Sequence, residues 1–569
     1  METTLLQYFS EELAYLRDGT KQFAKRYPHV ASRLNLSKGQ TEDPHITRLL
    51  EAFALISSRI RLHQDHHFVQ LNTALLETLF PHYLAPQPSM AIVQFTPSDS
   101  LTASENISRG QLLETLSSYG TPLHFTTSYA TEVLPLSIAD VKVHTDYNRL
   151  DITLNCLNDK QKIVDLGLTK LRFFMHTDHQ QGFNLCEQLM TNCAMLTLHH
   201  SPEEKAFATL SADAIKPVGL QADEAILPWS HAAAPAARLL SEYLTFKDKF
   251  LFFDIDFSAN NLAMAGHRMT LQLQFTKRLS AALNYLTADN LLLNCTPVIN
   301  LFKKTLEPLM IDGQQYEYPL TVDKRHADHY EIHTIEQVSD ITDTQHPQII
   351  PGLYRPNHYT LQSNTWSAQR KYHTIHSHQT SSMYLSLSER TTMNNNKRVL
   401  AIEASCFNGD LPKQLNLPQH YYHLQLANGG ASLAGIRFIS QPTPVYHRSK
   451  QQTVNGQLIN QLADNVRLMT DAKAALQYIK NTLISCNITQ TKENNTLIDS
   501  IIKVEPQQII MRTGNNKLTP YYYGTEMQIT LKAERLSGHS VFLFKQILQS
   551  SFSLESNLNS RVKWKFILE

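Results

Sequence analysis

The sequence predicts a multidomain α+β protein with an N-terminal helical block, β-rich, sandwich-like middle domains and a C-terminal α+β domain. In residues 1–88, apolar side chains recur at helical spacing. From residue 89, short segments alternate apolar and polar residues between turns about ten residues apart. Residues 450–569 return to helix and then follow a strand–strand–helix–strand order. With 569 residues, the chain is long enough for several domains, and we expect them at 1–88, 89–311, 312–449 and 450–569.

The N-terminal block has more apolar surface than a few helices need for their own packing. The helical repeat consists of Leu5, Phe9, Leu13, Leu16, Ile46, Leu49, Leu50, Phe53, Ile56 and Ile60. Pro28 is expected to end or restart the first helix near Tyr27. Asp43 followed by Pro44 is typical of a helix start. We therefore expect part of this block to pack against another surface.

Residues 89–311 read mainly as strands, with one helix expected at Ala234–Leu244. The expected strands are Met90–Phe95, Leu112–Thr126, Ala130–Val143, Leu150–Leu157, Leu168–His176, Gln188–His199, Phe250–Phe257 and Met269–Thr276. Short strands at this spacing favour a sandwich-like architecture.

Residues 312–380 are rich in glycine and proline, which predicts extended chain and turns. Strands are expected to resume in residues 383–387, 399–404, 423–426 and 434–440. After these, residues 456–484 have a helical pattern. The last elements are expected at Lys503–Arg512 (strand), Gly524–Ala533 (strand), Ser540–Phe552 (helix) and Arg561–Leu568 (strand).

The composition argues against several functional classes. Lys+Arg and Asp+Glu both number 51, so the chain lacks the basic balance of a nucleic-acid-binding protein. A neutral chain with 18% charged residues offers little repulsion against assembly. The N-terminus does not resemble a signal peptide, and no apolar run is long enough to span a membrane. The cysteines form no CxxC pair and read as reduced, buried thiols of a cytosolic protein: Cys156, Cys186, Cys193, Cys295, Cys406 and Cys486.

Three histidine clusters are the first candidates for chemistry. They are His63/Asp65/His66/His67, His176/Asp178/His179 and His326/Asp328/His329. His63 and His67 are four residues apart and could share a metal on one helix face. The chain has no HExxH motif, and the clusters lie on polar helix faces or turns, so solvated side chains are the favoured interpretation. A metal-dependent hydrolase stays open as an alternative.

Nucleophile and nucleotide motifs are weaker still. The chain has no GxSxG, P-loop or GxGxxG motif, and Gly538-His539-Ser540 lacks the second glycine of a nucleophile elbow. Cys295 lies in an apolar segment that would raise the pKa of its thiol. Asp254 and Asp256 share one strand face and are interpreted as its exposed side. We predict no catalytic site and no cofactor, and keep a ligand-binding β-sandwich as a further alternative.

Ordered segments along the whole chain resemble the TssF family of type VI secretion baseplate subunits. They include ELAYLR (12–17), DPHITRLLEAFALISSRI (43–60), LLSEYLTFKDKFLFFDI (239–255), SCFNGDLPKQL (405–415) and LSGHSVFLFKQILQSSFSLESNLNS (536–560). The chain departs from the family pattern at Phe407 and Gly409 and lacks the usual tryptophan before residues 459–465. The resemblance is to a divergent member.

The resemblance implies a structural, non-enzymatic role in the cytoplasm, at a baseplate docked on the inner-membrane complex. Family members form wedges of two TssF copies and one TssG, joined to TssK. Several wedges surround the VgrG spike hub and prime assembly of the sheath and tube. The partners implied are TssG, a second TssF copy, TssK, the VgrG hub and sheath proteins, with no nucleic acid and no membrane insertion.

Two interaction surfaces follow as hypotheses from the resemblance. The helical block would join the two copies with TssG through Leu13, Leu16, Leu49, Phe53 and Ile56. The C-terminal domain would contact neighbouring wedges through Phe542, Phe544 and Ile547. Two identical chains beside one unlike chain need two shapes, which hinges in the loop-rich middle could supply.

Overall fold

A computed structural model divides the chain into two compact units. The first comprises Met1–Phe80 with Ser449–Gly456, and the second Pro81–Arg448 with Gln457–Glu569. The structure describes residues 2–33, 45, 47–61, 84–116, 122–158, 160–228, 235–257, 262–343, 345–353, 364–375, 378–388, 397–418, 421–427, 429, 433–448, 471–512, 521–553 and 562–569. Among the helices in these ranges, none has the length and apolar character needed to span a membrane.

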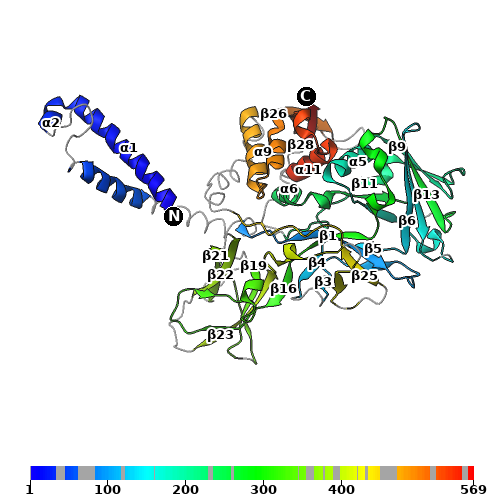
Figure 1. Ribbon diagram of the computed structural model, residues 1–569, viewed down its shortest axis with the longest axis horizontal. Helices are drawn as coiled ribbons and strands as arrows, with labels where there is room; N and C mark the ends of the chain where they lie inside the picture. Colours follow the sequence, from blue (N-terminus) through cyan, green and yellow to red (C-terminus); the bar gives the residue numbers. More distant parts are fainter. Residues whose placement is uncertain are drawn as a thin grey trace. The chain divides into compact units, whose positions relative to one another are not determined.

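The first unit is helical, as the apolar spacing indicates (Figure 1). Helix α1 spans Glu2–Arg26, and α2 follows at Pro28–Arg33. The break before Pro28 is confirmed; a proline tolerates the first helical position because its missing N–H needs no partner there. A further helix occupies residues 47–61. The expected cap at Asp43 and Pro44 lies outside the described residues.

The second unit begins with a closed barrel of strand order β1-β15-β4-β3-β24-β25. Its strands are β1 (Met90–Pro97), β3 (Leu112–Thr115), β4 (His124–Thr127), β15 (Cys295–Ile299), β24 (Leu424–Leu426) and β25 (Leu433–Phe438). Val93 pairs with Thr296 of β15 on one side and Phe438 of β25 on the other. Strands from two expected domains thus close one barrel, where the sequence favoured a sandwich. Beside it, β2 (Glu105–Ile107) pairs with β5 (Thr131–Val133).

Two further sheets share one hydrophobic core with helices α5 and α6. The five-stranded sheet has the order β10-β9-β13-β7-β6, and the four-stranded sheet β11-β12-β8-β14. Their elements are β6 (Leu136–His144), β7 (Arg149–Cys156), β8 (Lys170–Met175), α5 (His179–Thr191), β9 (Cys193–His199), β10 (Ala208–Ser211), β11 (Ile215–Pro217), α6 (Pro235–Thr245), β12 (Phe252–Asp256), β13 (Arg268–Phe275) and β14 (Leu291–Leu292).

Helix α5 corrects the expectation of a strand beginning at Gln188. The Asp178 side chain accepts a hydrogen bond from the Gln181 N–H and so caps this helix. Phe183, Cys186 and Leu189 then face the core at helical spacing. The strand that was expected there begins only at Cys193, as β9.

An inserted β domain, residues 302–407, occupies the stretch that the sequence indicated as partly loop-rich. One sheet has the order β16-β23-β19-β20, with β17 also on β23, and a second has the order β18-β22-β21. The strands are β16 (Phe302–Thr305), β17 (Leu309–Ile311), β18 (Tyr318–Pro319), β19 (Glu331–Asp340), β20 (Gln348–Ile350), β21 (Thr365–Ile375), β22 (His378–Ser388) and β23 (Arg398–Phe407). The sequence predicts extended chain and turns here; the long β19 and β21 show that much of the extended chain is ordered by strand pairing, which the polar composition of these segments does not indicate.

The C-terminal segment follows the expected element order. Helices α9 (Ala472–Cys486) and α10 (Lys492–Asp499) precede strands β26 (Ile501–Arg512) and β27 (Tyr521–Leu531). Helix α11 (Val541–Ser553) then leads to β28 (Val562–Leu568), which lies parallel to β27. Its buried residues belong to the same core as α5 and α6, so this segment is continuous with the two sheets. The mixed α+β class is confirmed.

Candidate functional surfaces

In the first unit, a polar contact joins α1 and the 47–61 helix. Ser57 Oγ donates to Glu12 Oε2 at 3.2 Å, and Arg61 Nη1 donates to Glu12 Oε1 at 2.9 Å. The Arg61 guanidinium also lies over the Tyr8 ring, 5.6 Å from its centroid. Because residue numbers rise along one helix as they fall along the other, the two helices run antiparallel. The Arg61 side chain of this pair is half exposed, so the pair contributes at most about 1 kcal/mol.

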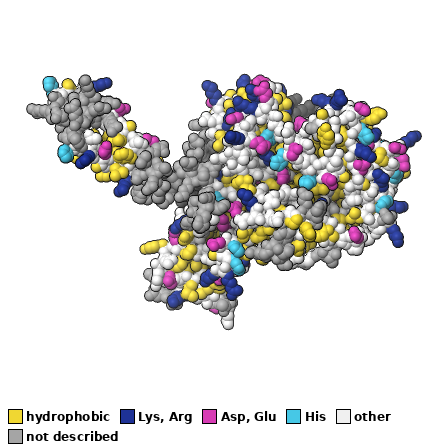
Figure 2. Space-filling model, in the orientation of Figure 1, with side chains coloured by type: hydrophobic (Ala, Val, Ile, Leu, Met, Phe, Trp, Pro, Cys, Tyr) yellow, Lys and Arg dark blue, Asp and Glu magenta, His cyan; other side chains and the backbone are white. Residues whose placement is uncertain are grey.

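The 47–61 helix buries its small side chains and exposes its large apolar ones. Ala54 and Ser58, one helical turn apart, are both 0% exposed. Four large side chains are 54–70% exposed: Leu49, Phe53, Ile56 and Ile60. Their spacing of four, three and four residues aligns them as one stripe along the helix. Hydrophobic side chains are visible on this unit's surface in Figure 2. We call these four residues the apolar stripe.

The structure separates the predicted residues of this block into two groups. Leu49, Phe53 and Ile56 belong to the exposed apolar stripe, whereas Leu13 and Leu16 on α1 are half-buried. Ile60 continues the stripe and was visible in the sequence as the next turn after Ile56. Tyr15 is 76% exposed and has no such signal, because it lies outside the apolar repeat.

The predicted contact residues of the C-terminal domain lie mostly inside the protein. Phe544 and Ile547 are 0% exposed, and only Phe542 is half-buried. The Phe544 ring stacks on Tyr243 of α6 with 6.2 Å between centroids. Phe544 and Ile547 are therefore corrected from contact residues to core residues: the apolar face of α11 packs on α5, α6 and β28.

Helix α11 is also fixed at its start by a carboxylate from another helix. Glu187 of α5 accepts hydrogen bonds through Oε2 from Ser540 Oγ at 2.6 Å and from the Phe542 N–H at 2.7 Å. Ser540 Oγ in turn accepts from the Leu543 N–H at 3.1 Å. A carboxylate at a helix N-terminus accepts hydrogen bonds from N–H groups that have no partner within the helix, and its negative charge is attracted to the positive end of the helix dipole. This contact holds the C-terminal segment on the central core.

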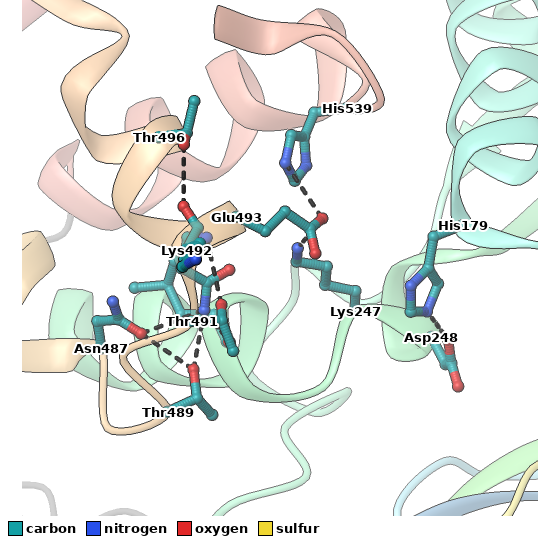
Figure 3. Close-up of polar contacts among 12 residues, drawn as sticks. His179, Lys247, Asp248, Asn487, Thr489, Thr491, Lys492, Glu493, Thr496 and His539 are labelled. Atoms are coloured by element: carbon teal, nitrogen blue, oxygen red, sulfur yellow. Dashed lines mark hydrogen bonds and ion pairs between the residues drawn. The ribbon is translucent and has the colours of Figure 1, made fainter.

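A second polar contact joins the same parts of the molecule (Figure 3). Glu493 of α10 accepts from Lys247 Nζ at 2.5 Å, and His539 Nε2 lies 3.3 Å from the same carboxylate oxygen. Lys247 belongs to the 3₁₀ helix η5 (Lys247–Phe250) beside α6. Burial, together with the Lys247 charge, lowers the pKa of His539 to about 4, so this histidine is neutral at pH 7. Ser540 and His539 thus bond to different carboxylates, and the Gly538-His539-Ser540 sequence forms no nucleophile site.

The chain enters and leaves the second unit along one pair of antiparallel segments. Gln87 and Tyr446 exchange backbone hydrogen bonds of 2.9 and 3.1 Å. Thr245 of α6 donates to Gln87 Oε1 at 2.8 Å, and Tyr372 of the inserted β domain donates to the Leu84 carbonyl at 2.6 Å. Residues 84–90 are buried. Contacts with α6 and with the inserted β domain therefore fix the segment at residues 84–87, and its pairing with Tyr446 fixes the second segment.

One serine, histidine and glutamate do meet, but in an order that does not suit catalysis. Glu331 Oε2 accepts from Ser381 Oγ at 2.8 Å and from His447 Nε2 at 3.0 Å. It also accepts from the Ser381 N–H at 3.0 Å. The carboxylate lies between the serine and the histidine, so the serine–histidine contact of a catalytic triad is replaced by two separate contacts to Glu331. This arrangement ties β19, β22 and residue 447 together and is structural.

The described part of the chain has no group of three His, Cys, Asp or Glu side chains placed to hold a metal ion. His179 Nε2 contacts Asp248 Oδ1 at 2.6 Å, which raises the pKa of His179. His176 instead faces the Asp289 carbonyl, and Asp178 caps α5. His326 stacks on His329, with 5.3 Å between centroids. The cluster at residues 63–67 lies outside the described residues.

The candidate carboxylates and thiols also have structural surroundings. Asp254 is 7% exposed and accepts two hydrogen bonds from Arg172, at 2.7 and 2.8 Å, so it is not on an exposed strand face as expected. Asp256 pairs with Lys216 instead. Burial raises the pKa of the Cys295 thiol and raises that of Cys186 to about 12. A thiol with so high a pKa is not a nucleophile at neutral pH.

Comparison with known proteins decides the family. The family model described as "Type VI secretion system, TssF" matches residues 1–569. The chain belongs to the TssF family. The match spans both units, including the helical one with the apolar stripe. A TssF relative, the type VI secretion system component TssF1 of Pseudomonas aeruginosa, is 25% identical over 601 residues, which cover 98% of this chain and 96% of the relative.

Two solved structures share the fold of this TssF chain. One is a cryo-electron microscopy structure of a type VI secretion TssK-TssF-TssG baseplate subcomplex, with a TM-score of 0.72 and 20% identity. It covers 92% of this chain and 96% of the matched chain. The other is the baseplate complex from the type VI secretion system, with a TM-score of 0.60, 19% identity and coverage of 99% and 97%.

Proposed function

We propose that this TssF protein is a structural, non-enzymatic subunit of the type VI secretion baseplate wedge. In this role two copies assemble with one TssG and with TssK around the VgrG hub. Family membership over the whole chain supports the assembly role. The apolar stripe on the first unit carries the proposal further, because large apolar side chains in a row on a helix mark a contact surface.

The apolar stripe is the proposed joint to TssG and to the second copy. Full burial of a large apolar side chain is worth about 1.5–3 kcal/mol, and these four are more than half exposed. Ala54 and Ser58, on another face of the same helix, are fully buried, whereas the stripe is exposed and can receive a partner helix. Leu13 and Leu16 contribute as half-buried neighbours on α1. A partner helix with its own apolar face would form a bundle with this hairpin.

The C-terminal domain is the proposed contact to neighbouring wedges, in a revised position. Because Phe544 and Ile547 are in the core, the contact cannot run through them. Phe542 is still partly accessible. Ile502 and Ile510 of β26 are 42% and 66% exposed, and Leu568 of β28 is 48% exposed. These side chains are a better basis for a wedge-to-wedge surface.

The remaining parts of the proposal concern the setting. The protein acts in the cytoplasm, at a baseplate anchored through TssK to the inner-membrane complex, and wedge assembly primes sheath and tube formation. Energy for secretion comes from sheath contraction, so the chain needs no chemistry of its own. The polar clusters described above, each occupied by structural contacts, fit that role.

Charge substitutions in the apolar stripe test the joint. Phe53→Glu and Ile56→Glu place carboxylates where an apolar helix would dock, and we expect at least a tenfold loss of TssG recovered in co-purification. The control is Glu51→Lys, an exposed charge change on the other side of the same helix. Full recovery of a two-to-one complex from the double variant would contradict the joint. Circular dichroism of the free chain checks that the helices persist.

A further inference from the structure

The inserted β domain has a hydrophobic core of its own, separate from the cores of the barrel and of the two core sheets. In the described part of the chain, Leu112 of β3 is the one partly buried apolar side chain from outside this domain that packs on its core. Leu112 lies close to where the chain enters the domain, because it pairs with Thr126, whose hydroxyl donates to the Leu301 carbonyl at 3.0 Å. A domain with its own core can keep its fold while its orientation changes. The orientation of this domain therefore depends mainly on the polar contacts at its boundary.

The first boundary contact lies where the chain crosses into and out of the domain. Asn300 precedes β16 and Asn408 follows β23, and both side chains are 0% exposed. The Asn408 N–H donates to Asn300 Oδ1 at 2.7 Å, and Asn300 Nδ2 donates to Asn408 Oδ1 at 2.9 Å. Asn300 Nδ2 also donates to the His124 carbonyl of β4 at 2.7 Å. These bonds join both crossings to the barrel at one place, and we call Asn300 and Asn408 the pivot.

A second boundary contact joins the domain to the segments that lead toward the first unit. Tyr372 of β21 donates to the Leu84 carbonyl at 2.6 Å, and His447 Nε2 donates to Glu331 Oε2 of β19 at 3.0 Å. The Tyr372 and His447 rings also meet edge to face, with 6.5 Å between centroids. Ser381 of β22 donates to the same Glu331 oxygen, so three strands of the domain take part. We call the Tyr372–Leu84 and Glu331–His447 contacts the latch.

The latch holds the two described chain segments that are closest in sequence to the first unit. That unit comprises Met1–Phe80 and Ser449–Gly456, so Leu84 follows its first part by four residues and His447 precedes its second part by two. A displacement of the first unit therefore reaches both latch segments through only a few residues of chain. Through the latch it also acts on the orientation of the inserted β domain, because hydrogen-bonded networks with two discrete arrangements can carry such coupling.

We propose that the inserted β domain is a movable arm, with Asn300 and Asn408 as its pivot and the latch as the contact that sets its orientation. Polar contacts suit this use, because hydrogen bonds can break and re-form while both hydrophobic cores stay intact. When the first unit docks on a partner, displacement of residues 84 and 447 opens the latch. The proposal rests on the assembly role proposed above: of the two copies in a wedge, one keeps the latch closed and the other opens it.

A distance measurement on the free chain tests the latch. Spin labels are placed on Met310→Cys in β17 of the inserted β domain and on Met195→Cys in β9 of the core, both at exposed side chains. Cys193, the one cysteine that is not buried, is replaced by serine in every protein compared. Double electron–electron resonance should give one narrow distance distribution for the chain with an intact latch. The distribution reports the orientation of the inserted β domain relative to the core.

Variants in the latch should change that distribution. Tyr372→Phe together with His447→Leu removes both hydrogen bonds of the latch and leaves Glu331 bonded to Ser381. We expect the distribution to broaden about twofold or more, or to gain a second distance, because the arm can then turn about the pivot. Tyr372→Phe alone loses a single hydroxyl, so it tests the latch even if the double variant does not fold, and it should change the distribution in the same direction.

The matched control is Thr245→Val. This substitution removes the hydrogen bond from α6 to Gln87, in the segment that the latch also holds, but it does not touch the inserted β domain. The distance distribution should stay as it is in the chain with an intact latch. A distribution that is also unchanged in both latch variants overturns the proposal. Equal broadening in the control overturns it too, because the effect would then not depend on the latch.

The assembled complex provides the second measurement. Labelled chain is assembled with its cognate TssG and TssK and a large excess of unlabelled chain, so that most complexes hold at most one labelled copy. Two distances are expected, one of them equal to that of the free chain. A single distance overturns the latch as the source of two shapes. Failure of the unlabelled chain to bind TssG and TssK overturns the assembly role instead, and the measurement on the free chain still decides whether the latch sets the orientation.

Discussion

Glu242 and Lys249 form an ion pair in which both side chains are 0% exposed. The other Glu242 oxygen accepts hydrogen bonds from the backbone N–H groups of Ile226 and Leu227, at 3.1 and 3.0 Å. It also lies 3.4 Å from Arg238 Nη1, one turn earlier on α6. Burial lowers the pKa of Lys249, and the Glu242 carboxylate opposes that effect. One carboxylate thus fixes α6, η5 and the loop at 226–227 in a single arrangement.

Removing one member of this pair should destabilise the second unit strongly. Lys249→Met leaves the Glu242 carboxylate buried with less compensating charge, and we expect a loss of about 3–5 kcal/mol. Thermal unfolding followed by intrinsic fluorescence measures it as a lowered Tm. Lys216→Met breaks a solvent-exposed pair with Asp256 and should leave the Tm unchanged. Equal Tm values for the two variants would show that the buried pair contributes no more to stability than the exposed pair does.

Two phenylalanines of α11, two residues apart, should differ sharply in their effect on stability. Phe544→Ala opens a cavity beside Tyr243 and should cost about 3–5 kcal/mol. Phe542→Ala removes a half-buried side chain and should cost about 1 kcal/mol or less. Urea unfolding of the two purified variants gives the comparison. A Phe544→Ala protein as stable as wild type would place this side chain outside the core.

The carboxylate of Glu187 should stabilise the docking of α11. Glu187→Ala removes the acceptor of the Ser540 hydroxyl and the Phe542 N–H, and we expect a loss of about 1–2 kcal/mol. Hydrogen exchange should be faster at the first turn of α11 than in wild type. Glu203→Ala, at an exposed acid, is the control. Unchanged exchange in α11 would mean that packing alone holds this helix start.

Acid should weaken the inserted β domain through His333. Burial, with the nearby Arg370 charge, lowers the pKa of His333 to about 3, whereas an unfolded histidine titrates near 6.5. Stability is therefore complete above pH 6.5 and is lost as the pH falls toward 3, because only the unfolded chain takes up the proton. At pH 5 the loss is on the order of 2 kcal/mol.

The His333→Leu variant checks the origin of this acid sensitivity. Its Tm should fall less between pH 7.5 and pH 5 than the wild-type Tm does. Some sensitivity should remain, because the pKa of His539 is also lowered. Each protein serves as its own reference at pH 7.5, so a change in packing at position 333 does not affect the comparison. Parallel Tm curves for the two proteins would exclude His333 as a source.

Local sequence patterns were sufficient to predict an element when its own residues carry a helical or strand period or a proline that ends it. Pro28 ends α1 as expected, because proline cannot continue a helix. Strand β7 has the two-residue period of a strand and α11 the period of a helix, and both lie where the sequence indicated. The pattern was insufficient for β19, whose polar residues are ordered by pairing with the distant strand β23, and for β21, whose polar residues are ordered in a hairpin with β22. Helix α5 was missed because its decisive cap, Asp178, was interpreted as part of a histidine cluster.

By itself, the sequence determined the mixed α+β class, the element order of the C-terminal segment and the resemblance to TssF, because these depend on local periodicity and on ordered segments along the chain. Only the tertiary structure decided which apolar faces are still available. It left Leu49, Phe53 and Ile56 exposed and buried Phe544 and Ile547. Helical spacing marks a face as apolar, but another helix of the same chain can cover that face.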